Sequence, residues 1–246
     1  MRVINDIRLC GIGSIGRMIE KPGKPFLFGR YNLIGRRYAA KLYSLEFHVG
    51  NGGEIFILQF KNDLSHGVVG PDFGGLCRSY SCGAEPTKIL EMTESERHDY
   101  FASCITKMML QVSAKENLET EKIRLVDDLI LKERENLGVT LASSKFDNWS
   151  IRAEYRIGED SCLSVIAENL DSSRTFKILD LPLDEYEDAR LLARTIRIKK
   201  SSVSVLSKHG IVAEHMLRRY SERLKILGVE CRKRHFEIPL PDPCQT

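Results

Sequence analysis

Three glycines near the N-terminus raise the first chemical question of this sequence. Gly11, Gly13 and Gly16 in "RLCGIGSIGR" follow an apolar run with the spacing G-x-G-x-x-G, which is typical of a turn that binds the pyrophosphate of a dinucleotide. Such a turn opens a helix, whose N-terminal amides hold the phosphate groups. Here Pro22 and Pro25 would break that helix soon after it begins. We therefore interpret the glycines as a strand connection and expect no cofactor.

A second group of residues has the side-chain types of a metal site. Cys77 and Cys82 are separated by four residues, and His66 precedes them in a glycine-rich stretch. A structural zinc ion needs four ligands from such residues, and the sequence offers no evident fourth. We expect no metal site, and these three residues are the candidates that the sequence offers for one.

Recognisable catalytic motifs are absent from the sequence. It contains no P-loop, no H-E-x-x-H pair, no EF-hand loop and no nucleophile elbow. His98 and Asp99 are adjacent, but no serine or cysteine beside them completes a known signature. We assign no catalytic residue and favour a protein that is not an enzyme. An enzyme with its site around the 61–88 loop is one alternative.

Basic residues are concentrated towards the C-terminus. Residues 190–235 contain 13 Lys/Arg and three Asp/Glu, a net charge of +10, whereas residues 62–189 carry a net charge of −11. Because Lys and Arg contacts to phosphates dominate nucleic-acid affinity, the favoured function is non-enzymatic binding of RNA, single-stranded nucleic acid or another polyanion by residues 190–235. The residues assigned to this surface are Arg190, Arg194, Arg197, Lys199, Lys200, Arg218, Arg219, Arg223, Arg232, Lys233 and Arg234.

The same charge distribution also suits a protein partner. An acidic and a basic segment on one chain favour docking of an oppositely charged protein, as in an inhibitor, an immunity-type antidote or an adaptor. Pairs such as Glu214 with Arg218 would neutralise part of the basic surface within a helix. Arg218-Arg219 and residues 232–234 match the letters of a bipartite nuclear import signal, but we expect the first pair to lie within a helix, where such a signal is not accessible.

Composition indicates a globular protein without membrane spans. Of the 246 residues, 42% are hydrophobic and 29% are charged, close to ordinary globular usage. No apolar stretch is long enough to span a membrane, and Asp6 and Arg8 interrupt the region where a signal peptide would be apolar. The odd number of scattered cysteines favours a reducing compartment, so we expect a cytoplasmic location. The oligomeric state stays open.

Hydrophobic periodicity predicts the elements of the first half. Alternation over 43–49 and 54–60, around the glycines of 50–53, predicts an antiparallel hairpin. Residues 61–88 have little periodicity and are expected to form a long irregular loop. Thr93 and Glu96 form a capping-box pattern before an amphipathic helix at 94–113. A second helix is expected at about 118–137, with Leu125, Val126 and Leu129 facing inward.

The second half predicts a meander followed by basic helices. Strict alternation predicts strands at 149–157, 161–168 and 174–181. A helix starting at Pro182 would place Arg190, Arg194 and Arg197 on one face, and a last helix would run from Ala213 to Leu227, before a strand within 229–238. The fold class is therefore α+β, with antiparallel hairpin or meander sheets packed against amphipathic helix pairs. The chain forms a single unit or two lobes, 1–138 and 139–246.

Overall fold

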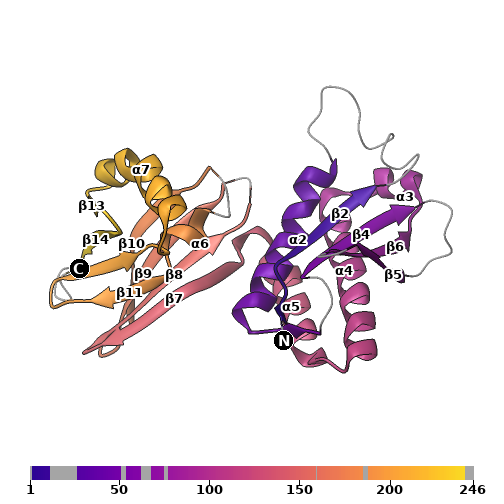
Figure 1. Ribbon diagram of the computed structural model, residues 1–246, viewed down its shortest axis with the longest axis horizontal. Coiled ribbons are helices and arrows are strands. Elements are labelled where there is room, and N and C mark those ends of the chain that lie inside the picture. The colour runs from indigo at the N-terminus through magenta and orange to yellow at the C-terminus, as the bar shows by residue number, and fades with distance from the viewer. Residues whose placement is uncertain are drawn as a thin grey trace. The chain divides into compact units, whose positions relative to one another are not determined.

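The computed structural model of the chain describes residues 2–11, 27–50, 54–61, 68–74, 77–158, 160–184 and 188–241. Its helices and strands confirm the α+β class. The chain divides into two compact units, 1–137 and 138–246, whose elements are labelled in Figure 1. Within the described ranges, the helices are too short or too polar to cross a membrane.

The N-terminal unit contains a mixed four-stranded sheet. Its strands are β2 (Asp6–Gly11), β4 (Ile55–Lys61), β5 (Val68–Gly74) and β6 (Cys77–Gly83), in the order β2-β4-β6-β5. The first three strands of this order are parallel, and β5 is antiparallel to β6. Two short strands, β1 (Arg2–Val3) and β3 (His48–Val49), pair with each other. Because β2, β4 and β6 are parallel, their carboxyl ends lie at one edge of the sheet.

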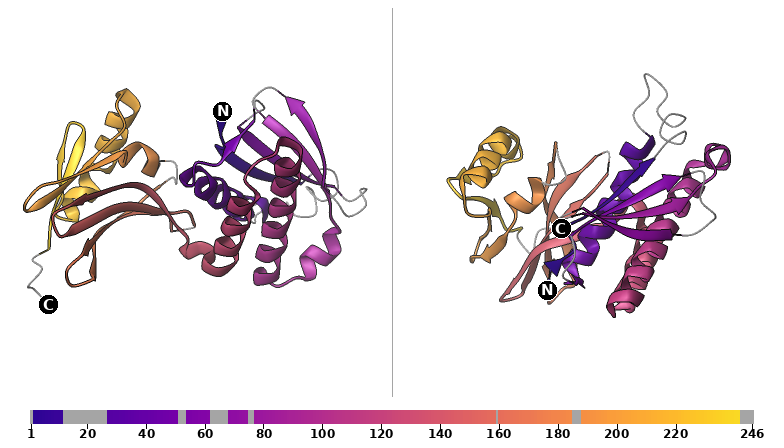
Figure 2. Two further views of the ribbon diagram at one scale, coloured as in Figure 1. Left: turned by 90° about the horizontal axis from the view of Figure 1, so that it is seen from below. Right: turned by 45° about the vertical axis from the view of Figure 1, so that its right-hand side comes forward.

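Three long helices accompany this sheet. They are α2 (Leu27–Ser44), α4 (Glu94–Glu116) and α5 (Thr120–Glu133), which pack against one another, with a short helix α3 (Pro86–Glu91) before α4 and a 3-10 turn (Arg134–Asn136) after α5 (Figure 2). Helix α2 connects the parallel strands β2 and β4 and lies close against β2. A Cβ atom added at Gly35 would lie 2.4 Å from the carbonyl oxygen of Ile7. Glycine at this position therefore permits the close approach.

Helix α4 begins as the sequence predicts. The Thr93 amide donates to the Glu96 carboxylate (2.7 Å), and the Glu96 amide donates to the Thr93 hydroxyl (3.3 Å), so both bonds of the capping box are present. The helix ends at Asn117, which has a left-handed conformation (φ 54°). Its predicted apolar stripe is buried: Phe101, Ile105, Met108, Met109 and Val112. In α5, Val126 is buried as predicted, but Leu125 is exposed.

The predicted hairpin at 43–49 and 54–60 is wrong. Tyr43 belongs to the last turn of α2, and β4 pairs in parallel with β2 and β6. Within 43–49, Tyr43 is exposed, Phe47 and Val49 are buried, and only His48–Val49 form a strand, β3. The pattern of one strand does not indicate which strand will pair with it, and here both partners are distant in the sequence.

The prediction of an irregular loop at 61–88 is also wrong, since β5, β6 and the first half of α3 lie there. In β6, buried Arg78, Tyr80 and Cys82 alternate with half-buried Cys77, Ser79 and Ser81. Only one buried residue of this strand is a large apolar one, so the strand lacks a hydrophobic pattern.

The first glycine of the G-x-G-x-x-G pattern, Gly11, is the last residue of β2. Residues 12–26 lie outside the described ranges, so our interpretation of the other two glycines stays a prediction.

The C-terminal unit begins with an antiparallel meander. Its strands are β7 (Gly138–Phe146), β8 (Trp149–Arg156), β9 (Cys162–Asn169) and β10 (Arg174–Pro182), in the order β10-β9-β8-β7. Three of them confirm predicted strands, and the inward residues of β8, Ile151, Ala153 and Tyr155, are buried. The sequence missed β7, because few of its side chains are buried.

A second antiparallel sheet completes this unit. Its strands are β11 (Thr195–Ile198), β12 (Ser202–Leu206), β13 (Glu230–Arg232) and β14 (His235–Pro239), in the order β11-β12-β14-β13. The last helix, α7 (Ile211–Ile226), lies where a helix is predicted and buries Ala213, Leu217, Tyr220 and Leu224, whereas Leu227, the last residue of the predicted helix, follows α7 and is exposed. The helix predicted from Pro182 through Arg197 is wrong, because the described helix α6 spans only Asp188–Leu192. The residues Thr195–Ile198, "TIRI", which follow this helix, are mostly β-branched, as is common in strands, and form β11.

Candidate functional site

The basic residues of the C-terminal unit lie on several elements. The prediction that Arg190, Arg194 and Arg197 share a helix face is wrong, because α6 ends at Leu192 and Arg197 lies in β11. Arg218, Arg219 and Arg223 do lie on α7, as predicted, and the first two are in the middle of that helix. The others follow strands or end them: Lys199 and Lys200 after β11, Arg232 at the end of β13, and Lys233 and Arg234 in the turn before β14.

Two arginines of α7 are held by acidic residues of the same unit. Arg223 pairs with Asp184 at 2.7 Å, and Arg219 pairs with Asp184 at 3.1 Å and with Asp188 at 3.6 Å. The Tyr220 hydroxyl donates to Asp188 (2.6 Å), and both guanidinium groups lie over the Tyr220 ring. Hydrogen bonding from Arg223 lowers the pKa of Asp184. Arg219 and Arg223 are therefore engaged inside the unit.

Further carboxylates engage other members of the basic group. Glu237 accepts from the Ser202 hydroxyl (2.5 Å), pairs with Lys199 at 3.0 Å and lies 3.9 Å from Arg232. These donors and cations lower the pKa of Glu237 to about 2. Arg234 pairs with Glu214 at 3.6 Å, and Arg190 also has an interaction partner.

Five cations of the group have no ion pair among the described residues. They are all exposed: Arg194, Arg197, Lys200, Arg218 and Lys233. We call this set the unpaired cations. The carboxylates of the unit thus neutralise about half of the basic residues that the sequence assigns to one surface and leave the other residues available for an external anion.

Two of the unpaired cations lie at the same end of the second sheet. The Arg194 amide donates to the Leu206 carbonyl (2.8 Å), and the Ser207 amide donates to the Arg234 carbonyl (3.0 Å). Arg194 and the turn that contains Lys233 are therefore attached to the same end of β12.

Arg218 lies near this end as well. Glu214, which pairs with Arg234, is four residues before Arg218 on α7, and residues with this spacing are neighbours on a helix face. The arrangement brings positive charges from the β11 edge, the β13–β14 turn and α7 to one region of the unit.

The face of the second sheet that bears Arg197 carries both signs of charge. Strand register places Arg197 opposite Ser204, Ser204 opposite Glu237, and Glu237 opposite Glu230. Directly opposed side chains of antiparallel strands share a face, and Arg232 belongs to this face too, because it is two residues from Glu230. The alternate residues form the buried apolar side: Ile196, Val203, Val205, Phe236 and Ile238.

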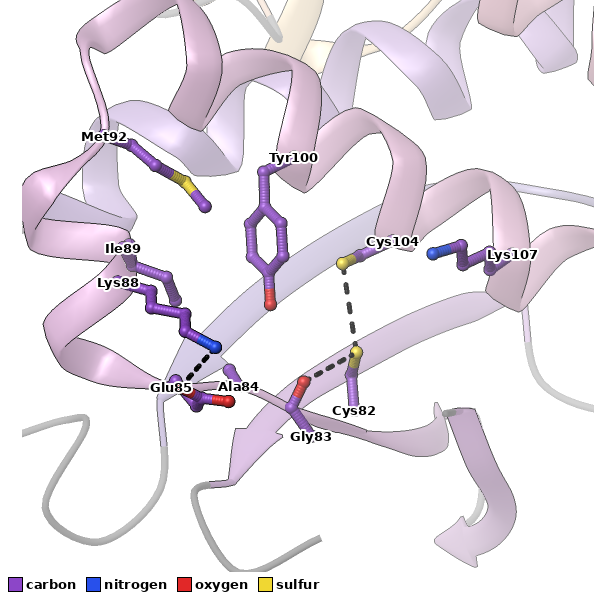
Figure 3. A pocket seen from close by; sticks show the side chains of 10 residues that line it. All are labelled: Cys82, Gly83, Ala84, Glu85, Lys88, Ile89, Met92, Tyr100, Cys104 and Lys107. Carbon is purple, nitrogen blue, oxygen red and sulfur yellow. Dashed lines mark hydrogen bonds and ion pairs between the residues drawn. The ribbon is translucent and has the colours of Figure 1, made fainter. Parts of the chain in front are cut away.

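A cavity of about 330 Å³ in the N-terminal unit forms a second candidate site (Figure 3). It lies beyond the carboxyl end of β6, between that strand and helices α3 and α4. Tyr100, Cys104 and Lys107 come from one face of α4, because they are separated by four and three residues. Cys82 comes from β6, and Lys88 from α3.

Two thiols approach each other at this cavity. The sulfur atoms of Cys82 and Cys104 are 3.9 Å apart, and both residues are buried. The hydrogen bond with Cys104, assisted by the charge of Lys107, lowers the pKa of the Cys82 thiol. The same bond and burial raise the pKa of Cys104, and burial raises that of Tyr100. Cys82 is thus the thiol of the pair that ionises first.

The candidate metal ligands of the sequence do not come together here. Cys77 and Cys82 are five residues apart on β6, so their side chains point to opposite faces of the sheet, roughly 16 Å apart at about 3.3 Å per residue. His66 lies outside the described ranges. In the part of the chain that the structure describes, no three Cys, His, Asp or Glu side chains are grouped closely enough to hold a metal ion.

Sequence reasoning named Cys82 but missed Cys104. The spacing of Tyr100, Cys104 and Lys107 on a predicted helix was a usable signal, since it places a thiol, a hydroxyl and an amine on one face. The contact between Cys104 and Cys82 could not be predicted, because the segment that forms β6 was interpreted as a loop.

No protein-family model, no curated protein and no solved structure matches the chain.

Proposed function

We propose that the C-terminal unit binds a polyanion, RNA or another single-stranded nucleic acid, through its unpaired cations. The observation that supports this most directly is that carboxylates of the unit pair with some of its basic residues and not with others. Arg219 and Arg223 are engaged by Asp184, whereas Arg194, Arg218 and Lys233 are exposed and without an ion pair among the described residues.

The number of unpaired cations sets the expected salt dependence. A cation that already neutralises a carboxylate releases few counterions when a phosphate approaches, so the unpaired ones dominate the effect. For single strands, the slope of log K against log salt concentration is about −0.7 per phosphate neutralised. Five cations therefore predict a slope of about −3.5.

The test is a salt titration of binding to a labelled single-stranded RNA. The site variant carries Arg218→Glu and Lys233→Glu. The matched control carries Lys145→Glu and Arg174→Glu, which are exposed residues of the same unit without ion pairs among the described residues. Both variants change the net charge equally. We expect the site variant to lower the steepness of the slope by about 1.4 and the control to leave it unchanged. Equal slopes in the two variants would contradict a specific surface.

A protein partner is the second candidate, and the mixed charges of the second sheet favour it. Arg197 and Arg232 share a face with Glu230 and Glu237, and such a pattern suits a partner with complementary charges better than a uniform polyanion. This function predicts weak RNA binding that is equally affected by the site and control variants.

A further inference from the structure

The cavity of the N-terminal unit is lined by two thiols and by residues that are exposed at the surface. Cys82 and Cys104 belong to different elements, a strand and a helix, yet their sulfur atoms are 3.9 Å apart. Both residues line the cavity together with Lys88 and Lys107, which are exposed. The cavity therefore leads from solvent to the two thiols, although each is at least 95% buried.

The surroundings of the thiols favour a ligand with negative charge. Lys107 lies next to Cys104 on the cavity wall (Figure 3) and has no ion pair among the described residues. Lys88 pairs with Glu85 at 2.8 Å, so its charge is partly compensated. Ile89 and Met92 contribute an apolar part of the wall. A small molecule with a carboxylate and a less polar, sulfur-containing centre matches these groups.

We propose that Cys82 and Cys104 are a redox-active pair that exchanges with an anionic low-molecular-weight disulfide bound in this cavity. The proposal is supported by the distance between the sulfurs, by the cavity volume of about 330 Å³ and by the amine of Lys107, which has no ion pair among the described residues. The inference is independent of RNA binding, because it concerns the other unit of the chain.

The exchange proceeds in two balanced steps. The Cys82 thiolate attacks one sulfur of the disulfide, forms a mixed disulfide with it and displaces the other half as a thiolate. The Cys104 sulfur then gives its proton to the solvent and attacks the Cys82 sulfur, which releases the second half. Together the cysteines lose two electrons and two protons and form a Cys82–Cys104 disulfide, while the small disulfide is reduced to two thiols.

The order of attack follows from which of the two thiols ionises first. The thiolate is the nucleophile in such reactions, and the neighbouring Cys104 and Lys107 lower the pKa of Cys82. Cys104 is a buried residue of α4, and the hydrogen bond with Cys82 and burial raise its pKa. Cys82 therefore attacks first, and Cys104 resolves the mixed disulfide.

The experiment uses the full reduced chain and oxidised glutathione as the probe. Disulfides are mapped by peptide mass spectrometry after brief exposure and acid quenching. In the wild type we expect a Cys82–Cys104 link. In Cys104→Ser we expect glutathione to remain attached to Cys82, and in Cys82→Ser we expect neither product.

Cys77→Ser is the matched control, because this half-buried thiol lies on the same strand and does not line the cavity. It should form the Cys82–Cys104 link at the wild-type rate. Circular dichroism of each variant establishes that it is folded, so that loss of reaction is not loss of structure.

The role of the amine is tested with a neutral probe. Lys107→Gln should slow the attachment of glutathione in the Cys104→Ser background by about threefold or more at pH 7, and should slow the reaction of hydroxyethyl disulfide less. The proposal is overturned if the first link formed does not join Cys82 and Cys104, or if glutathione attaches to other cysteines as readily as to Cys82. Equal effects of Lys107→Gln on both probes would overturn the anionic specificity.

Discussion

At the scale of single residues, carboxylates decide which cations of the C-terminal unit can meet a ligand. Asp184 binds Arg219 and Arg223, which follow it by more than 30 positions in the sequence. The charge count of residues 190–235 was readable from the sequence, but these pairings depend on the fold. The sequence could therefore predict a basic region and could not separate its engaged members from its available ones.

The ion pairs of Glu237 make the stability of the C-terminal unit depend on pH. Ser202, Lys199 and Arg232 lower its pKa from 4.5 to about 2 in the folded protein. A carboxylate whose pKa is depressed by folding stabilises the protein above its ordinary pKa, and this contribution disappears as the pH falls through the folded value. The stabilisation is therefore lost between about pH 4.5 and pH 2.

Glu237→Gln should remove this contribution. We expect the variant to unfold at lower urea concentration than the wild type at pH 7, and the difference to shrink as the pH approaches 2. Urea unfolding at a series of pH values measures it. Parallel stability curves over that range would show that the ion pairs contribute nothing to folding.

At the scale of elements, Gly35 fixes how α2 meets β2. Gly35→Ala would gain up to about 1 kcal/mol of helix propensity. The added Cβ would lie 2.4 Å from a backbone oxygen of Ile7, so the helix or the strand would have to move, and overpacking of this kind costs about 1–3 kcal/mol. We expect net destabilisation, measured by denaturant unfolding. Ser95→Ala, at an exposed position of α4, is the control and should change stability by about 0.5 kcal/mol or less. A stabilised Gly35→Ala protein would show that the contact relaxes without cost.

Elements with a local signal were predictable, and those defined by distant partners were not. The capping box of Thr93 and the apolar stripe of α4 are encoded within a few residues, and the alternation of β8 is equally local. Strand β6 carries Arg78 and Cys82 at buried positions, so its hydrophobic pattern is weak. Its parallel neighbours also come from other parts of the sequence. The thiol pair was missed for the same reason, because Cys82 and Cys104 meet only once β6 is part of the sheet.

At the scale of the whole molecule, each unit has its own sheets and buried core. Val203, Phe236 and Leu217 are buried in the C-terminal unit, and a separate apolar cluster fills the N-terminal one. We predict that a fragment of residues 138–246 folds alone and keeps the salt dependence of RNA binding. Circular dichroism and the same RNA titration test this. A fragment that folds but binds with a flat slope would place part of the surface in residues 1–137.

The net charge of the whole chain does not describe how its charges are distributed. The net charge of +3 for the chain conceals a net charge of −11 over residues 62–189 and of +10 over residues 190–235, so the isoelectric point of the intact protein says little about the basic region. Binding experiments are therefore best interpreted from variants of matched charge, as in the two double reversals proposed for the C-terminal unit.

The chain contains one tryptophan, Trp149, which is largely buried in β8 with its ring 6.0 Å from that of Phe176. Light at the long-wavelength edge of the protein absorption band excites tryptophan selectively, so the resulting fluorescence reports on the meander around Trp149 alone. A fluorescence transition that coincides with loss of helical dichroism would mean that the two units melt cooperatively. Separate transitions would give each unit its own stability in one intact molecule, without any label.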